Sequence, residues 1–589
     1  MLMGFKWQKK TEYYLSFCAI CVFALYLLSK SNSVRTVWEL GDEAGYISNA
    51  AFLCGYNWSC VFEVNSFYNI GYSIMLIPAF LLSGTGEQLI HYCICTNIFI
   101  VLVTAIIIIY LLGHLLELNN VLINTLISIV VCSNPYLVSN CLKINCECLC
   151  FCSVCIVYLL LFFCSGNSNL LLIIMLGMAL GYMPFIHTRL LVVSIPLCIY
   201  ALGLILFLKG QNTQHKRKFL DVFAFILSYG VTYVVLWIIK NNILSYISSV
   251  RIEQDTPITN VVTANSILSW FLWLIDPSNF NRYWGAFIQK VYSMNVISMG
   301  LYGLGLYLAI RHCFNLYAER QNAKILVLSP FVLSILMILA CIFTGTAATS
   351  FNNFVYTRYF EYVVLLSFAF SLALLFYNKV PIKIGPIILF LSALIGKICL
   401  SLSNLFESTI IGYDTARIPD YSLGISISNE YNDMFVFEIM ITTIICMWAI
   451  ISTSDRWSNI FTKFTLLFLV AYITFKNTDI CTKEIIRINN EQYADTAMAN
   501  KIYSCFSANS HIYILDDDSY RFRKYYMRMQ CLLKDIPLIT VLEDDIEKIT
   551  DLQKGDFVII YKTNPHYSEY KNENLLFFEG ATFSSIYIK

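Results

Sequence analysis

The chain has 589 residues, of which 58% are hydrophobic and only 13% are charged, and its formal net charge is +1. A soluble protein carries about twice that share of charged residues, so the composition excludes an ordinary soluble enzyme and indicates an integral membrane protein. No run of basic residues favours a nucleic-acid partner.

The N-terminus carries Lys6, Lys9 and Lys10 ahead of an apolar stretch from Tyr13 to Leu28. This order of charge and apolar residues is shared with secretory signal peptides. No small-residue cleavage site follows here, and many more apolar segments do. We therefore interpret the stretch as an uncleaved first transmembrane helix.

Membrane-spanning helices need about 20 apolar residues. Thirteen segments are predicted to span: 13–29, 88–112, 121–138, 147–164, 170–185, 190–208, 219–239, 287–310, 325–343, 359–377, 386–403, 434–452 and 458–475. The run 68–83 is short and contains Pro78, so we expect a helix that lies in the membrane interface. The predicted fold class is an α-helical polytopic membrane protein with interfacial helices in its first outer loop and a small C-terminal α/β domain.

The loops alternate in charge, which predicts their orientation. Lysine and arginine gather in the N-terminus and in the short loops 209–218, 311–324, 378–385 and 453–459, whereas most acids stand in the opposite loops. Basic loops favour the cytoplasmic side. We therefore expect a multi-pass protein of the cell membrane, with a cytoplasmic N-terminus and an extracytoplasmic first loop and C-terminal region.

The chain changes character after residue 476, which divides it into a predicted membrane domain (1–476) and an extracytoplasmic α/β domain (477–589). Strands are expected at 511–518, 536–542 and 555–562, and helices at 519–535 and 543–553. Such alternation predicts a parallel sheet with right-handed crossovers. Asp516, Asp517 and Asp518 end the first strand, where α/β sheets bind ligands, although helix capping by Asp518 or Ser519 is the favoured interpretation.

Two further features can be explained by ordinary membrane-protein structure. The cysteines at 146, 148, 150, 152 and 155 enter an apolar helix and point several ways round it, as small hydrophobic residues do and converging metal ligands do not. The loop 241–285 carries tryptophans at 270, 273 and 284. They suit either a segment beside a lipid tail or an ordinary aromatic belt, and both interpretations stay open.

The acids Asp42 and Glu43, in "GDEAGY", follow the first span and are candidate catalytic residues. An amphipathic helix on the outer membrane face is predicted directly after them. Asp42 could simply cap that helix, but a cap needs one short polar residue and leaves the second acid unexplained. The helix is predicted from apolar Ile47, Ala50, Ala51 and Cys54 at helical spacing, with Ser48 and Asn49 opposite.

Further charged residues are expected on the same outer face. Glu147 opens the fourth span, His187 and Arg189 lie between the fifth and sixth, and Arg358 and Glu361 stand at the start of the tenth. An arginine at the end of a span often only reaches for water. Together these groups suit an anionic lipid headgroup held by arginine and histidine, with a carboxylate nearby to move a proton.

The stretch "GDEAGYISNAAFLCGYNW" resembles the first-loop motif of the GT-C superfamily of membrane glycosyltransferases, in the branch with protein O-mannosyltransferases and lipid A aminoarabinose transferases. The resemblance implies transfer of a sugar from a polyprenyl-phosphate donor to a lipid, glycan or protein acceptor on the outer face. Asp42 matches the catalytic acid and Glu43 its neighbour, and Glu147 matches a second acid.

The same resemblance assigns the donor phosphate to the segments "HTR", with His187 and Arg189, and "YTRYFE", with Arg358 and Tyr359. It requires no nucleotide-binding loop and leaves a divalent metal ion open as a cofactor. Rival interpretations are a transporter or flippase, a glycan polymerase or ligase for lipid-linked envelope precursors, and an envelope scaffold. A transporter would show related halves, a polymerase would rely on outer-loop arginines, and a scaffold would leave Asp42 and Glu43 unexplained.

Overall fold

The structure is a computed structural model, and it describes only part of the chain. For some residues, Asp42 among them, it describes the backbone but not the side chain. The described ranges are 2–37, 41–62, 68–116, 118, 120–166, 169–208, 215–250, 287, 290–291, 294, 297–315, 321–343, 360–377, 391, 394, 456–507, 509–516, 527–542, 553, 555–562, 575–580 and 583–588.

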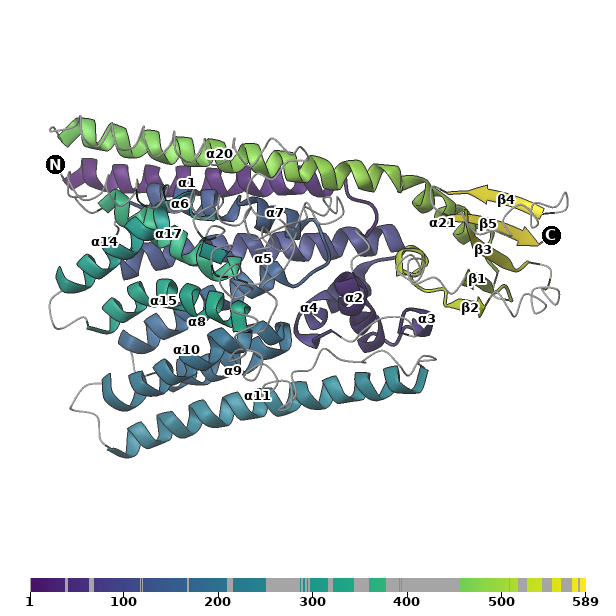
Figure 1. Cartoon of the computed structure of the whole chain (residues 1–589), viewed down its shortest axis with the longest axis horizontal. Coiled ribbons are helices and arrows are strands. Elements are labelled where there is room, and N and C mark those ends of the chain that lie inside the picture. The colour runs from purple at the N-terminus through teal and green to yellow at the C-terminus, as the bar shows by residue number, and fades with distance from the viewer. Residues whose placement is uncertain are drawn as a thin grey trace, which may run out of the picture.

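Long helices make up a bundle with a small sheet at one end (Figure 1). The first and last long helices, α1 and α20, meet near the C-terminal end of α1, where Lys30 of α1 donates to Asp479 of α20 at 2.9 Å. The helices are α1 (Leu2–Ser31), α2 (Gly41–Leu53), α3 (Ser59–Phe62), α4 (Ile70–Leu82), α5 (Gly86–Leu115), α6 (Val121–Cys132), α7 (Pro135–Cys141), α8 (Glu147–Gly166), α9 (Leu170–Ile186), the short turns η1 (Thr188–Leu190) and η2 (Leu204–Leu208) around α10 (Leu191–Gly203), α11 (His215–Val250), α14 (Leu301–Asn315), α15 (Gln321–Phe343), α17 (Glu361–Tyr377), α20 (Arg456–Glu491) and α21 (Tyr493–Cys505).

Six helices within the described residues are long and apolar enough to cross a membrane, and a seventh span arises if α6 and α7, bent by 67°, count as one. Shorter apolar helices coincide with the spans predicted at 170–185, 325–343 and 359–377. The spans predicted at 386–403 and 434–452 lie outside the described residues, apart from Leu391 and Leu394. The chain is therefore a multi-pass membrane protein, and the count of thirteen stays a prediction.

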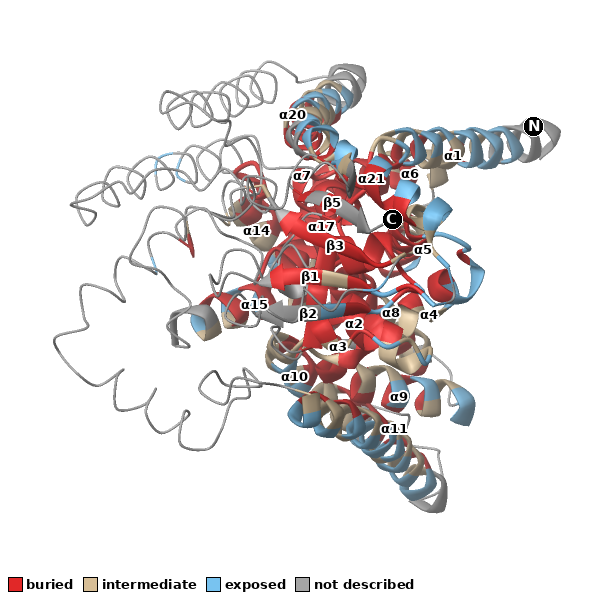
Figure 2. Ribbon diagram, turned by 90° about the vertical axis from the view of Figure 1, so that its right-hand side faces the viewer, coloured by how far each residue is buried: buried red, intermediate tan, exposed pale blue. Residues whose placement is uncertain are grey.

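The outer helices present apolar side chains to the surroundings. In α1 and α11 only 17% and 11% of the most apolar window is buried, and exposed residues run along both helices (Figure 2). Such a surface is stable against lipid and not against water. The helix α11 continues to Val250, so residues 241–250, which we expected in a loop, are helical. The tryptophans of that loop lie outside the described residues.

The first loop forms the helices α2, α3 and α4 at the end of the bundle that faces the sheet (Figure 1). The expected apolar side of α2 is buried, but so are Ser48 and Asn49 on its other side, each 1% exposed. The reason is a second layer of protein, since Asn49 Nδ2 donates to Tyr68 O at 2.8 Å. The predicted helix is therefore confirmed, but the expectation that Ser48 and Asn49 form an exposed polar side was wrong, and the position of α2 at the membrane face stays a prediction.

The helix α4 has 13 residues and contains Pro78, so it is too short to cross a bilayer on its own. This matches the short helix expected at 68–83. The helix α2 begins at Gly41, which places Asp42 in its first turn and not at the residue before the helix. The positive end of the helix dipole favours a carboxylate there.

The C-terminal sheet has five strands in the order β2-β1-β3-β5-β4. The predicted parallel pairing is confirmed for β1 with β2 and with β3, whereas the antiparallel pairs β3–β5 and β4–β5 were not predicted. The predicted helix 543–553, apart from Gln553, and the side chains of Asp516, Asp517 and Asp518 lie outside the described residues. The strands are β1 (Ile512–Asp516), β2 (Leu538–Leu542), β3 (Phe557–Tyr561), β4 (Leu575–Glu579) and β5 (Phe583–Ile588).

The boundary predicted at 476/477 falls inside α20, which runs unbroken to Glu491. The helix therefore joins the bundle to α21 and the sheet without a linker. The division into two domains stays a prediction.

Candidate active site

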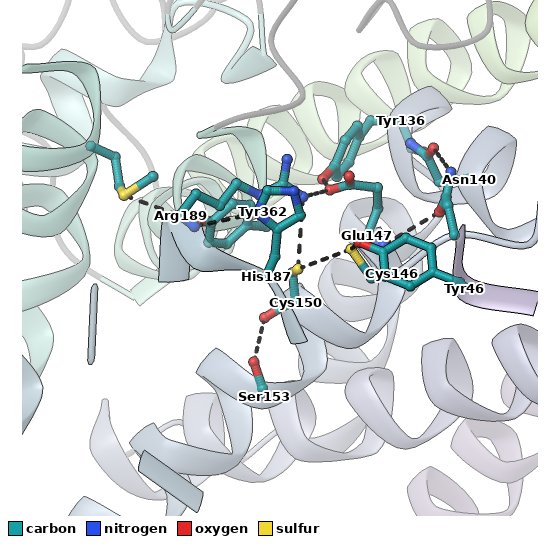
Figure 3. Close-up of polar contacts among 12 residues, drawn as sticks. Tyr46, Tyr136, Asn140, Cys146, Glu147, Cys150, Ser153, His187, Arg189 and Tyr362 are labelled. Carbon is teal, nitrogen blue, oxygen red and sulfur yellow. Dashed lines mark hydrogen bonds and ion pairs between the residues drawn. The ribbon is translucent and has the colours of Figure 1, made fainter. Parts of the chain in front are cut away.

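Glu147 is the centre of a buried polar cluster at the start of α8 (Figure 3). Its carboxylate accepts from the Tyr136 hydroxyl at 2.5 Å and forms an ion pair with Arg189 Nη2. The Glu147 side chain is 0% exposed and that of Arg189 is 7% exposed. Burying a charge away from water costs free energy, so buried charges are rare unless they are paired. In membrane proteins such charges mark functional positions.

Arg189 reaches the cluster from η1, the short turn between α9 and α10. His187 ends α9, and its Nδ1 accepts from the Arg189 amide at 3.3 Å. The guanidinium also lies 5.4 Å from the ring centre of Tyr362 and 3.7 Å from Cys150 Sγ. The start of α8, the end of α9, η1 and the start of α17 therefore meet at Arg189.

The turn before α8 is shaped by asparagine side chains. Asn134 caps α7 by accepting from the Tyr136 amide at 2.9 Å, and Pro135 fits the first helical position because its missing N–H needs no partner there. Asn145 Nδ2 donates to Asn140 Oδ1 at 2.6 Å, while its own Oδ1 accepts from the Glu147 amide at 3.3 Å. These bonds orient Tyr136 and Glu147 toward each other.

The first-loop motif docks onto the same turn. Glu43 is 0% exposed, and its Oε1 accepts from the Ile144 amide at 2.7 Å. The Tyr46 hydroxyl donates to Cys146 Sγ at 3.0 Å. Both contacts lie within three residues of Glu147, so "GDEAGY" and the start of α8 form one structural unit. The backbone of Asp42 belongs to this unit, and its side chain lies outside the described residues.

The structure brings together four of the residues predicted from sequence: Glu43, Glu147, His187 and Arg189. Arg358 and Tyr359 lie outside the described residues. Tyr362, three positions after Tyr359, contacts Arg189 and so places the start of α17 beside the cluster.

Four residues of this region were not predicted from the sequence: Tyr46, Tyr136, Tyr362 and Lys143. Tyr46 is the last residue of "GDEAGY" and Tyr136 follows the turn signal Asn134–Pro135, so both had a local signal. Lys143 had none, although it is only 1% exposed and precedes the amide that binds Glu43.

We predicted that Arg189 binds the donor phosphate and that Glu147 is a catalytic acid, and both roles stay predictions. The two side chains form an ion pair, so the charge of Arg189 is already compensated by one carboxylate. A phosphate that binds beside this pair needs additional positive charge or must displace Glu147.

The C-terminal region packs on the first loop from the sheet side. Trp58 Nε1 donates to Lys534 O at 2.9 Å, Cys60 Sγ donates to Gln530 Oε1 at 3.2 Å, and Lys534 Nζ donates to Ser83 O at 2.6 Å. Burial, with Cys93 and Glu43 nearby, raises the pKa of the Cys531 thiol well above its usual value. The segment before β2 is therefore buried beside the first-loop motif.

A bound metal ion would need several ligands that converge on one point. Among the described side chains, no three His, Cys, Asp or Glu residues converge in that way. The five cysteines at 146, 148, 150, 152 and 155 are buried thiols. The side chain of Asp42 is outside this description, so a divalent ion bound through Asp42 stays an open expectation.

Comparison with known proteins bears on the whole architecture. No protein-family model matches the chain, and no curated protein sequence matches it. Among solved structures the chain resembles ArnT from Cupriavidus metallidurans bound to undecaprenyl phosphate, with a TM-score of 0.52 and 10% identity over 96% of this chain and 97% of ArnT. The apo structure of ArnT gives a TM-score of 0.51 and 11% identity over 96% of each chain.

The chain shares the fold of ArnT. At this identity the likeness concerns the fold alone, and it covers nearly the whole of both chains. The architecture implied by the first-loop motif is therefore confirmed at the level of an ArnT-like fold, while the branch of the superfamily stays a prediction. Undecaprenyl phosphate, the lipid bound to ArnT, is a polyprenyl phosphate of the kind that the motif led us to expect as a donor carrier.

Proposed function

We propose that the protein is a glycosyltransferase that moves a sugar from a polyprenyl-phosphate donor to an acceptor hydroxyl on the outer face of the membrane. One observation carries the proposal. In an ArnT-like fold, the acidic first-loop motif is bonded to the same turn that presents the buried Glu147–Arg189 pair. The acceptor is a lipid, a glycan or a protein.

The reaction needs a base for the acceptor and charge for the leaving group. The Asp42 carboxylate accepts the acceptor's hydroxyl proton while the hydroxyl oxygen bonds to the anomeric carbon of the sugar. The bond between that carbon and the phosphate oxygen breaks, and the lipid phosphate leaves with the electron pair. A single displacement of this kind inverts the anomeric centre.

The departing phosphate gains negative charge, so cations must stand beside it. We assign this role to Arg189 and Arg358, with Glu147 as the residue that orients Arg189. His187, whose Nδ1 already accepts from the Arg189 amide, offers the phosphate a neutral N–H donor at Nε2. Because Glu147 compensates the charge of Arg189, the second cation at Arg358 is required and not redundant. The tyrosine hydroxyl of Tyr359 supplies a neutral donor.

Glu43 has a different role in this scheme. Its Oε1 accepts a backbone N–H, so it anchors α2 to the turn at Ile144 and positions the neighbouring Asp42. Asp42, in the first turn of α2, is then the acid of the motif that remains for proton transfer.

The proposal is tested by giving the purified full chain, in lipid nanodiscs, a panel of polyprenyl-phosphate sugars. Mass spectrometry of envelope glycans from cells with and without the chain identifies the sugar to be used. We expect transfer by the wild type and none by Asp42→Asn. Asparagine also suits a helix start, so this variant should still fold. Transfer by Asp42→Asn at the wild-type rate would contradict the role of Asp42 as base, and identical glycans in both cell types would contradict the proposed function.

A further inference from the structure

The start of α1, the end of α5 and the start of α6 lie at the end of the helical bundle away from the sheet (Figure 1). Residues of these three segments line a partly open cavity of about 320 Å³. Asn97 of α5 donates to Lys143 O, in the turn that leads to Glu147, at 2.6 Å. Tyr110 of the cavity is 13 residues further along that helix, or about 20 Å at 1.5 Å per residue. The cavity is therefore separate from the candidate active site.

Asn124 lines this cavity and carries a buried hydrogen-bond acceptor. The residue is 1% exposed, and its Nδ2 donates to Leu118 O at 2.9 Å, which fixes the orientation of the amide. Within the described part of the chain, Oδ1 has no hydrogen-bond partner. A buried acceptor left unpaired is costly, so a ligand that donates a hydrogen bond in the cavity would stabilise the fold.

The remaining lining residues indicate that the donor is positively charged. Glu12 contributes a carboxylate, and the described residues offer it no ion pair. Tyr110 contributes an aromatic ring, which stacks on His114 with 4.1 Å between ring centres. A carboxylate, an amide oxygen and an aromatic face together are the surroundings that an ammonium group prefers.

The cavity also borders the apolar outside of the bundle. Ile106 lines it and is 53% exposed, and Tyr13 lines it and is 61% exposed. Exposed apolar side chains on a membrane helix face acyl chains. A lipid whose headgroup enters the cavity would therefore find its tails beside these residues, with the exposed imidazole of His114 available for the headgroup phosphate.

We propose that this cavity binds a primary ammonium group, carried by a lipid headgroup or by a free amine. An N–H of the ammonium donates to Asn124 Oδ1, and its charge lies against the carboxylate of Glu12 and the ring of Tyr110. A quaternary ammonium has no N–H and leaves Asn124 unpaired, so the cavity should distinguish ethanolamine from choline. The proposal does not depend on the function assigned to the active site.

The experiment uses the full chain in nanodiscs that contain an ethanolamine phospholipid and a choline phospholipid with identical tails. Native mass spectrometry measures which lipid stays bound after release. We expect the ethanolamine lipid to be preferred about ten-fold, because it makes one charge-assisted hydrogen bond that the choline lipid cannot make. Glu12→Gln and Asn124→Leu should each remove that preference, whereas Glu87→Gln, an acid at the other end of α5, should keep it.

A second arm separates the two sources of the ammonium group. Free ethanolamine is added to the protein in nanodiscs of choline lipid, and thermal unfolding is followed. A stabilisation that disappears in Glu12→Gln assigns the site to a soluble amine, whereas a lipid preference without it assigns the site to a headgroup. Equal retention of both lipids together with no stabilisation by ethanolamine would overturn the proposal. Glu12 is only partly buried, so Glu12→Gln keeps the test valid even where Asn124→Leu fails to fold.

Discussion

Two arginine–carboxylate pairs are buried in the described part of the chain, and they differ in what else each carboxylate binds. Arg528 Nη1 lies 2.9 Å from Asp495 Oδ2, and both side chains are 0% exposed. The other oxygen of Asp495 accepts from the Phe583 amide at 3.3 Å. That pair joins α21 to β5 and to the segment that precedes β2. The Glu147 carboxylate instead accepts from a tyrosine hydroxyl, and its arginine contacts a thiol and an aromatic ring.

The comparison shows that burial of charge does not by itself mark a reactive site. A carboxylate bonded to a strand amide cannot exchange that partner without opening the sheet, so the pair at Asp495 acts as a clip. A carboxylate surrounded by side chains can exchange partners with a bound substrate when those side chains rotate. The pair at Glu147 has that freedom, and it is the one that lies beside the first-loop acids.

The largest expected effect separates the two pairs by activity. Each pair is removed as a whole, with Glu147→Gln/Arg189→Gln on one side and Asp495→Asn/Arg528→Gln on the other. Neither double variant leaves an isolated charge, so both should fold. We expect the first to transfer sugar at least about 1,000-fold more slowly per folded molecule, and the second to stay within about three-fold of the wild type. Equal rates in the two double variants would end the distinction between site and clip.

The second expectation concerns stability. Asp495→Asn alone leaves the buried charge of Arg528 without its carboxylate, which should cost about 3–5 kcal/mol. Hydrogen–deuterium exchange should become faster in β3 and β5 and stay unchanged in α8. The double variant Asp495→Asn/Arg528→Gln should restore much of the protection. Unchanged exchange in the single variant would show that the pair does not hold the sheet.

The third expectation tests whether the C-terminal segment positions the first loop. Lys534 is 3% exposed, donates to Ser83 O at 2.6 Å and lies 5.1 Å from the ring centre of Tyr56. Lys534→Met keeps the length of the side chain but loses the charged hydrogen bond. Such a bond contributes about 1.5–3 kcal/mol to stability. We expect sugar transfer to slow about ten-fold while the half-saturating donor concentration stays unchanged. The exposed Lys501 provides the control Lys501→Met, and a wild-type rate in Lys534→Met would mean that the segment only covers the loop.

The two pairs also show how far sequence reasoning extends. Glu147, His187 and Arg189 were predictable because each stands at the end of an apolar segment, where charge is unusual. That Arg189 pairs with Glu147 was not predictable, since 42 residues separate them and only the packing of α8 against η1 brings them together. Arg528 carried no signal, because an arginine within a predicted surface helix is ordinary.

The same distinction holds for the fold. Apolar length predicted the helices of the bundle, and the succession of strand-like and helix-like segments predicted β1, β2 and β3 as a parallel sheet. The pattern failed where polar residues continue a helix, as in α20 beyond residue 476, and where a polar face is covered by other parts of the chain, as at Ser48 and Asn49. In both cases the deciding contacts come from segments far away in the sequence.

The smallest expected effect asks whether the position of the Glu147 carboxylate matters. Tyr136→Phe removes one hydroxyl, and Glu147 remains paired with Arg189, so no charge is left isolated. A neutral hydrogen bond contributes about 0.5–1.5 kcal/mol, which corresponds to a rate about 2–10-fold lower if Glu147 must be held in place for transfer. Tyr158→Phe is the matched control, because Tyr158 is equally buried and its hydroxyl bonds Ser329 at 2.8 Å, away from Glu147. Slower transfer in Tyr136→Phe than in Tyr158→Phe, at equal thermal stability, would show that partners of the pair act on the reaction. Equal transfer in both would mean that Glu147 is held by Arg189 alone, and that the pair resembles the clip at Asp495 more closely than its surroundings indicate.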